Sequence, residues 1–247
     1  MYKGGTEMAG TMVHLEIADI LAQEWAGREV ITPYGSTRLV YDYFVAGNIC
    51  PDGIMARKGY VREMKKHTHF RDGIRDCDFH KKENLALFYK RLEDFMESSF
   101  NKFKSDNERS LYLGYWVHML ADEMFVVQIR PEFLKNISVT GLTEDNMETF
   151  KYFSKDVDMV DFRIVNEYKG IQRIYNALSG IEPYGISGMV TEEELTDSRN
   201  WILQYFFKTE HTRITEPVYI SYNRMMEFIK NTASKIYDVF KCCDNNK

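Results

Sequence analysis

The sequence predicts an all-α fold, a single-domain bundle of six to eight helices. Apolar residues recur every three or four positions through most of the chain, as they do on one face of a helix, and strand-like alternation is scarce. Of the 247 residues, 44% are hydrophobic and 28% are charged, which is enough apolar material for a sizeable core. Only five prolines are present and no Ser/Gly-rich tract resembles a linker, so we expect residues 1–247 to form one domain.

The same periodicity sets the expected elements. Helices are predicted at residues 13–25, 37–46, 82–104, 108–128, 143–176 (as one helix or two), 191–208 and 216–240. Gly47-Asn48 suits a C-terminal cap, and Thr191 followed by three glutamates suits an N-cap with an acidic first turn. Pro131 is expected to end the helix before it, and Pro217 to lie in the first turn of the last helix. Residues 49–78, punctuated by glycine and proline, are expected to be irregular.

Composition narrows the function. The net charge of −5 and the pI near 5.8 argue against broad nucleic-acid binding, which depends on a basic surface. No apolar run reaches the roughly 18 residues of a transmembrane segment, and charged residues interrupt the N-terminal region where a signal peptide would have its apolar core. We therefore expect a cytoplasmic protein. The HExxH, P-loop, GxGxxG and GxSxG motifs are absent, as is an adjacent His-Asp pair.

The segment LGYWVHMLADEMF places His118 and Asp122 in the most apolar predicted helix. A buried carboxylate costs free energy unless a partner compensates its charge. Residues four apart share one helix face, with Cβ atoms roughly 5–6 Å apart, so this pair can offer a nitrogen and an oxygen to one divalent ion. The alternative, a core histidine paired with its helix neighbour, is the more frequent explanation of an isolated HxxxD.

Other potential ligands change that balance. His14 begins the first helix on its apolar face, Asp52 follows a predicted helix end directly after a proline, and His67 and His69 lie in the irregular region. Each residue alone has a structural explanation as a cap, a turn or a solvated loop. Together they supply nitrogen and oxygen ligands from separate segments, which indicates a metal site.

These segments, taken in order, resemble the zinc-dependent phospholipase C family. The resemblance rests on T-M-V-H at His14, AGNICPD at Asp52, K-H-T-H-F at His69, and LGYWVHMLAD at His118 and Asp122. It covers residues 12–123 and is strongest at LGYxxHxxxD. The superfamily also contains fungal single-strand-specific nucleases.

The resemblance implies an all-helical fold with a metal cluster in a cleft. By this resemblance Asp52, His69, His118 and Asp122 form one metal site, and His14 joins Asp122, acting as a bridge, at a second. The THF context selects His69, and His67 is expected to be exposed.

The chain also departs from the family pattern. Secreted members use the amino group of an N-terminal tryptophan as a ligand, whereas here thirteen residues precede His14 and none of them is tryptophan. The family places two further histidines and an acid after the HxxxD helix, but His211 is the only histidine beyond Asp122. A third metal therefore looks absent or held by carboxylates. Asp161 and His211 are the candidates for additional metal ligands, although a solvated acidic face is the more frequent explanation of Asp161.

The sequence therefore predicts a metal-dependent phosphoesterase. We expect one or two Zn²⁺ ions, or another divalent metal, and water on this centre would attack a phosphodiester such as a phospholipid head group or another small molecule. Asp52 is the candidate catalytic residue, because it could orient that water. Two alternatives stay open: a non-catalytic helical protein with a structural metal, and a nuclease-like activity on nucleotides. No pattern in residues 130–247 selects a substrate or an oligomeric state.

Overall fold

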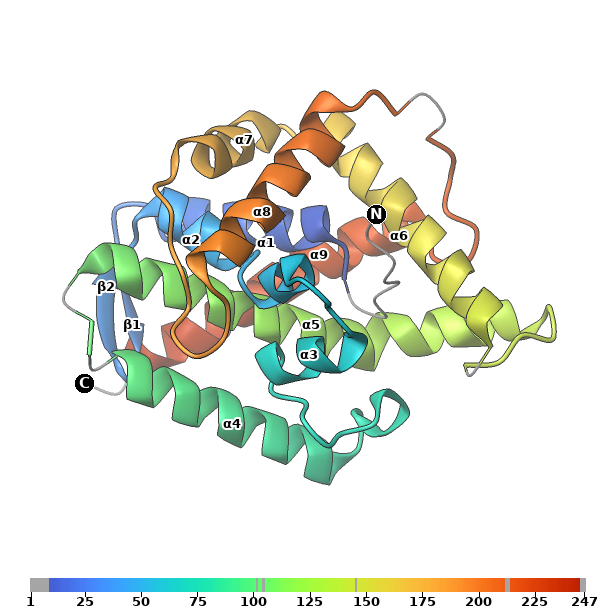
Figure 1. Cartoon of the computed structure of the whole chain (residues 1–247), viewed down its shortest axis with the longest axis horizontal. Coiled ribbons are helices and arrows are strands. Elements are labelled where there is room, and N and C mark those ends of the chain that lie inside the picture. The colour runs from blue at the N-terminus through green and yellow to red at the C-terminus, as the bar shows by residue number, and fades with distance from the viewer. Residues whose placement is uncertain (1–8, 101, 104, 145, 212–213, 245–247) are drawn as a thin grey trace.

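The computed structural model is almost wholly helical, which confirms the all-α prediction (Figure 1). It describes residues 9–100, 102–103, 105–144, 146–211 and 214–244. The α-helices are α1 (Thr11–Glu24), α2 (Tyr41–Gly47), α3 (Arg62–Thr68), α4 (Lys82–Phe100), α5 (Asp106–Ser138), α6 (Met147–Glu167), α7 (Ile171–Gly180), α8 (Glu192–Ile202) and α9 (Tyr222–Asp244). Two 3₁₀ helices, η1 (Pro51–Ala56) and η2 (Asp76–Asp78), and a π-helical segment, η3 (Leu203–Lys208), complete the helical elements of the described residues.

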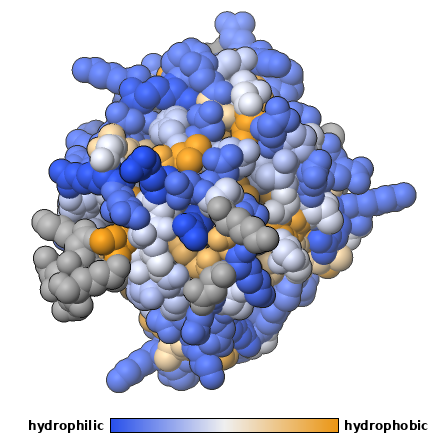
Figure 2. Space-filling model, turned by 90° about the vertical axis from the view of Figure 1, so that its left-hand side faces the viewer, coloured by the Kyte–Doolittle hydropathy of each residue, from blue (hydrophilic) through white to orange (hydrophobic). Residues whose placement is uncertain are grey.

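Helix α5 forms the centre of the bundle. Every side chain from Ser110 to Asp122 is buried, and α1, α2, α4 and α9 all contact this helix. The apolar faces of the outer helices point inward, and the face seen in Figure 2 is mostly hydrophilic with scattered hydrophobic residues. Within the described residues, none of the helices combines the length and apolar character that a membrane crossing requires.

Two glycines allow α2 and α5 to approach closely. A Cβ atom on Gly114 would lie 2.2 Å from the carbonyl oxygen of Phe44, and one on Gly47 would lie 2.0 Å from that of Leu111. Neither position can carry a side chain unless the two helices separate. The contact lies one helical turn before His118 and directly before Asn48, so it fixes how these two residues meet.

A β-hairpin replaces the start of the predicted helix at 37–46. Strands β1 (Glu29–Thr32) and β2 (Gly35–Arg38) pair antiparallel, and α2 begins only at Tyr41. The extended segment is held against the start of α5: the Thr37 hydroxyl donates to Asp106, and the Val40 N–H donates to Ser110. These tertiary hydrogen bonds override the local helical pattern.

The expected end of the central helix at Pro131 is wrong, because α5 continues to Ser138. Proline lacks the N–H for one intrahelical hydrogen bond and costs roughly 3 kcal/mol within a helix. Beyond it, however, α5 buries Phe133 and Ile137, and each side chain contributes about 1.5–3 kcal/mol by burial. Packing therefore outweighs the proline.

Three other boundaries differ from those expected. The region at 49–78 is not wholly irregular, since it contains η1 and α3. The helical stretch at 143–176 is divided into α6, whose N-cap is Asn146, and α7. The last helix begins at Tyr222 because the N–H groups of residues 218–220 donate to the buried Asp156 carboxylate instead of entering a helix. The N-cap at Thr191 is present as predicted and forms a capping box with Glu194, but α8 passes into a π-helical segment after Ile202.

Candidate metal centre

The structure brings five predicted site residues together from four parts of the fold. His14 comes from the first turn of α1, Asp52 from η1, His69 from the C-cap of α3, and His118 and Asp122 from successive turns of α5. The three histidines are each 1% exposed, and Asp122 is 5% exposed. Asp52 is the most accessible, with a side chain 16% exposed. His118 and Asp122 on α5 therefore face other polar side chains rather than the apolar core.

Four of the ligand atoms lie close together around His69 and His118. His69 Nε2 lies 3.3 Å from Asp52 Oδ1, 3.4 Å from Asp122 Oδ2 and 3.4 Å from His118 Nε2. His118 Nε2 lies 3.7 Å from Asp122 Oδ2. Ligands about 2.0–2.1 Å from a tetrahedral Zn²⁺ ion are separated from one another by roughly 3.3–3.4 Å. The three spacings around His69 Nε2 match this separation, and Asp52, His69 and His118 form one group able to hold an ion.

The second oxygen of Asp122 faces His14. His14 Nε2 lies 3.1 Å from Asp122 Oδ1, and its ring stacks on His118 with the centroids 3.8 Å apart. Asp122 consequently presents one oxygen to each of two ligand groups, as a bridging carboxylate does. In the described residues, His14, His118 and Asp122 form one group able to hold an ion, and Asp52, His69 and His118 form another.

Backbone carbonyl groups orient two of the imidazoles. His118 Nδ1 lies 2.8 Å from the carbonyl oxygen of Asn48, and His69 Nδ1 lies 2.9 Å from that of Lys65. Because a carbonyl oxygen can only accept, Nδ1 carries the hydrogen in both rings and the Nε2 lone pairs face the cluster. This arrangement is the one that metal-bound histidines ordinarily use.

The centre contains polar atoms that lack a hydrogen bond. Asp52 Oδ1, Asp122 Oδ2 and His14 Nδ1 are buried without a hydrogen-bond partner. Such atoms are costly in a folded protein, and a bound cation would compensate the two carboxylate oxygens. Burial, followed by the neighbouring His118, lowers the pKa of His14 to about 4, so its imidazole is neutral and available as a ligand. The donor set therefore fits a divalent metal.

The charge of Asp122 is preserved despite its burial. Burial alone would raise the pKa of this carboxyl group, but the neighbouring imidazoles of His118, His14 and His69 outweigh it and hold the pKa well below the ordinary value of 3.8. The charge of a carboxylate among the apolar residues of LGYWVHMLADEMF is thus explained by the imidazoles that lie beside it, including those from α1 and α3.

Three parts of this centre were not predicted from the sequence. Lys65 is buried, and its Nζ lies 2.5 Å from Asp52 Oδ1. Asn48 supplies the carbonyl group that orients His118. Helix α8 covers a cavity of about 10 Å³, room for one water, that is lined by His14, Asp52 and His118 together with Ser198, Trp201 and Ile202. In the sequence, the i,i+4 spacing from His69 was the one indication that Lys65 lies near the centre. No sequence pattern indicated that α8 covers it.

The other candidate residues, His67, Asp161 and His211, lie outside this centre. His67 is exposed, as expected, and pairs with Asp72. Neither group able to hold an ion contains Asp161 or His211. Asp161 instead takes the place of a cap at the start of α1, where burial raises its pKa and the N–H groups of Met12, Val13 and Thr11 oppose that rise. His211 is bonded elsewhere: its Nε2 donates to the Tyr205 carbonyl oxygen, and its ring stacks on Phe162.

Asp158, on the same helix as Asp161, gives a pH-dependent prediction. Burial raises its pKa to about 6, and the unfolded chain keeps the ordinary value of 3.8. The folded protein therefore binds this proton more tightly, and the free energy of unfolding falls as the pH rises from about 4 to above 6. Since Asp158 is partly exposed, we expect Asp158→Asn to stabilise the protein by only about 1 kcal/mol at pH 8. Urea denaturation should show this gain at pH 8 and none at pH 3.5; an equal difference at both pH values would contradict the prediction.

Comparisons with known proteins agree with the geometry. Residues 13–124 match the family model described as zinc dependent phospholipase C. No curated protein and no solved structure matches the chain. The family and the His/Asp groups both support Zn²⁺ as the cofactor. The match over residues 13–124, which hold all five candidate ligands, supports membership of the zinc-dependent phospholipase C family.

Proposed function

We propose that the protein is a zinc-dependent phosphoesterase that hydrolyses a phosphodiester of a small molecule or a lipid head group. The observation that carries the proposal is the convergence of Asp52, His118 and Asp122 on His69 Nε2 at 3.3–3.4 Å, with His14 on the second oxygen of Asp122. The zinc family supports the same class of activity.

Zinc, when bound, lowers the pKa of a coordinated water and polarises phosphate oxygens. In this chain Asp52, His69, His118 and Asp122 would hold one ion, and His14 with the bridging Asp122 would contribute to a second. Asp52 is the most accessible of the five side chains and lines the cavity beneath α8. We assign Asp52 a second role, in which it accepts a hydrogen bond from the attacking water and orients it toward the substrate.

A structural metal site is the second candidate, and one observation favours it. Four protein ligands around one ion leave no open position, which is typical of structural zinc. The remaining ligand His14 and the water-sized cavity that it lines favour the catalytic alternative, since both lie next to that ion position.

His118→Ala, matched with His67→Ala, separates these functions. Zinc content is measured by elemental analysis and turnover with a chromogenic phosphodiester. We expect wild type and His67→Ala to retain zinc and activity, because His67 is exposed and outside the cluster. His118→Ala should lose zinc and at least about a thousandfold in turnover. Zinc in the wild type without turnover of any phosphodiester would contradict the enzyme and support the structural role.

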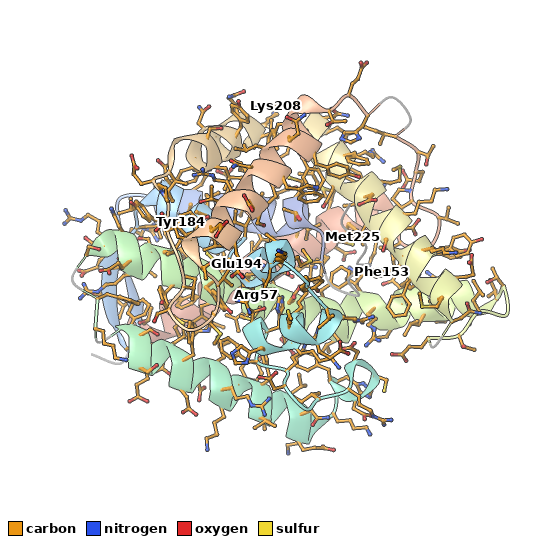
Figure 3. All side chains as sticks on the ribbon, in the orientation of Figure 1. Arg57, Phe153, Tyr184, Glu194, Lys208 and Met225 are labelled. Carbon is orange, nitrogen blue, oxygen red and sulfur yellow. The ribbon has the colours of Figure 1, made fainter. Side chains whose placement is uncertain are left out.

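Substrate entry requires α8 to move, because a cavity of about 10 Å³ cannot contain a phosphodiester. Arg57 at the end of η1 pairs with Glu194 in the first turn of α8, and it also donates to the Met189 carbonyl oxygen (Figure 3). These contacts tie the start of α8 to η1, the element that carries Asp52. At the other end, α8 continues into the π-helical η3, a geometry common at functional sites.

Weakening this pair should expose the centre more often. We expect Glu194→Gln to speed zinc release to a chelator about two- to fivefold, the range for removing a partly exposed ion pair. Glu193→Gln is the control, since Glu193 is an exposed neighbour in the same helical turn. Release is followed by stopped-flow absorbance of the chelator complex. Equal rates in the two variants would show that the Arg57–Glu194 pair does not restrict access.

A further inference from the structure

A buried ammonium group lies beside the candidate centre. Lys65 is 4% exposed, and its Nζ forms an ion pair with Asp52 Oδ1 at 2.5 Å. The contact lacks hydrogen-bond geometry, and neither atom has a hydrogen bond to any described residue. The oxygen that Lys65 contacts is the same one that lies 3.3 Å from His69 Nε2 in the ligand group of Asp52, His69 and His118.

The position of Lys65 is fixed by the segment that carries a ligand. Its carbonyl oxygen accepts the Nδ1–H of His69, and the Thr68 hydroxyl, 3.1 Å from the same oxygen, donates to the carbonyl oxygen of Pro51 next to Asp52. Helix α3 and η1 are therefore joined at the level of the centre. The backbone of Lys65 is thereby held beside Asp52.

We propose that Lys65 is a positioning residue whose fixed positive charge weakens Zn²⁺ binding at Asp52 and so makes that ion exchangeable. The inference rests on the proposed zinc site but not on any catalytic activity. An ion coordinated by Asp52 Oδ1 lies about 2.0–2.2 Å from this oxygen. With Nζ 2.5 Å from the same oxygen, the two cations cannot be more than about 5 Å apart.

Two effects of Lys65 on zinc affinity oppose each other. The ammonium group holds Asp52 in the geometry of a ligand, which favours zinc by about the contribution of one polar contact. It also repels a divalent ion at short range in a buried environment, where charge interactions are much stronger than in water. The repulsion involves two unit charges on the metal and is the larger effect, so removing the charge should tighten zinc binding.

Three variants separate charge from shape. Lys65→Gln keeps a polar side chain of similar length without charge, Lys65→Arg keeps the charge, and Lys66→Gln removes a neighbouring, more exposed charge as the control. Apparent zinc dissociation constants are measured by competition with a chromogenic chelator. We expect zinc to bind Lys65→Gln about 10- to 1000-fold more tightly than wild type. Lys65→Arg and Lys66→Gln should stay within about threefold of wild type.

A second measurement uses the thermal unfolding of metal-free and zinc-saturated protein. Without metal, Lys65→Gln should melt at a lower temperature than wild type, because Asp52 has lost its counter-charge. Saturating zinc should then raise its melting temperature more than that of wild type. A merely structural lysine would lower both melting temperatures alike.

The outcomes are distinguishable. Equal or weaker zinc binding in Lys65→Gln, with the fold retained by circular dichroism, would overturn this inference and leave the proposed function standing. If Lys65→Gln fails to fold, Lys65→Met decides by the same criterion. Absence of zinc binding in wild type and in both uncharged variants would overturn the inference together with the proposed function, whereas zinc binding by the uncharged variants alone would support the inference.

Discussion

Replacing Asp122 with asparagine should remove zinc from both ligand groups and abolish phosphodiester hydrolysis. Of the two carboxylates among the five candidate ligands, Asp122 is the one whose two oxygens face different histidines, His14 on one side and His69 and His118 on the other. The amide has nearly the same shape but no negative charge, so three buried imidazoles lose the anion on which they converge. We expect at least about a thousandfold loss of turnover, measured with a chromogenic phosphodiester on protein whose zinc content is known.

His14→Ala is the matched comparison for Asp122→Asn. His14 contacts only one oxygen of Asp122 and does not belong to the group of Asp52, His69 and His118. Elemental analysis should therefore find that His14→Ala keeps the ion held by Asp52, His69, His118 and Asp122, while Asp122→Asn keeps none. A finding that both variants retain the same amount of zinc would refute the bridging role of Asp122.

The largest loss of stability is expected at Asp19, which is not one of the candidate metal ligands. This carboxylate is fully buried and accepts hydrogen bonds from Tyr41, Tyr168 and Arg173, all between 2.6 and 3.1 Å. It thereby joins α1 to the start of α2 and to the turn before α7. Asp19→Ala leaves two tyrosine hydroxyls and a guanidinium group without their acceptor, and should cost about 3 kcal/mol.

Urea denaturation at pH 7 measures the effect of Asp19→Ala. Glu148→Ala provides the control, because Glu148 forms an exposed ion pair with Lys151 on the surface of α6. The control should change the free energy of unfolding by less than about 0.5 kcal/mol. Similar losses in the two variants would mean that the buried network at Asp19 contributes little to stability.

The central part of the site was predictable because its chemistry is local. His118 and Asp122 are four residues apart on an apolar helix, and this spacing alone places them on one face. The motif around His69 also distinguished it correctly from the exposed His67. That all five side chains meet is a matter of tertiary structure, which the ordered motifs indicated through their resemblance to a family.

The rest depended on contacts between distant segments. Lys65 appeared as one charge in a charged stretch, and nothing in the sequence near it shows that it is buried against Asp52. The cover formed by α8 comes from residues more than a hundred positions beyond most of the ligands. The same cause explains the missed hairpin, where pairing with the start of α5 outweighs a locally helical pattern.

The glycine contact between α2 and α5 links steric fit to metal chemistry. The backbones meet at Gly47 and Gly114, and the next residue, Asn48, presents the carbonyl oxygen that fixes the tautomer of His118. A single added methyl group in this crossing would shift that carbonyl, although it would alter neither the charge nor the identity of any ligand. A substitution at either glycine, a residue with no functional group, would thus change the electron-donating strength of the His118 imidazole.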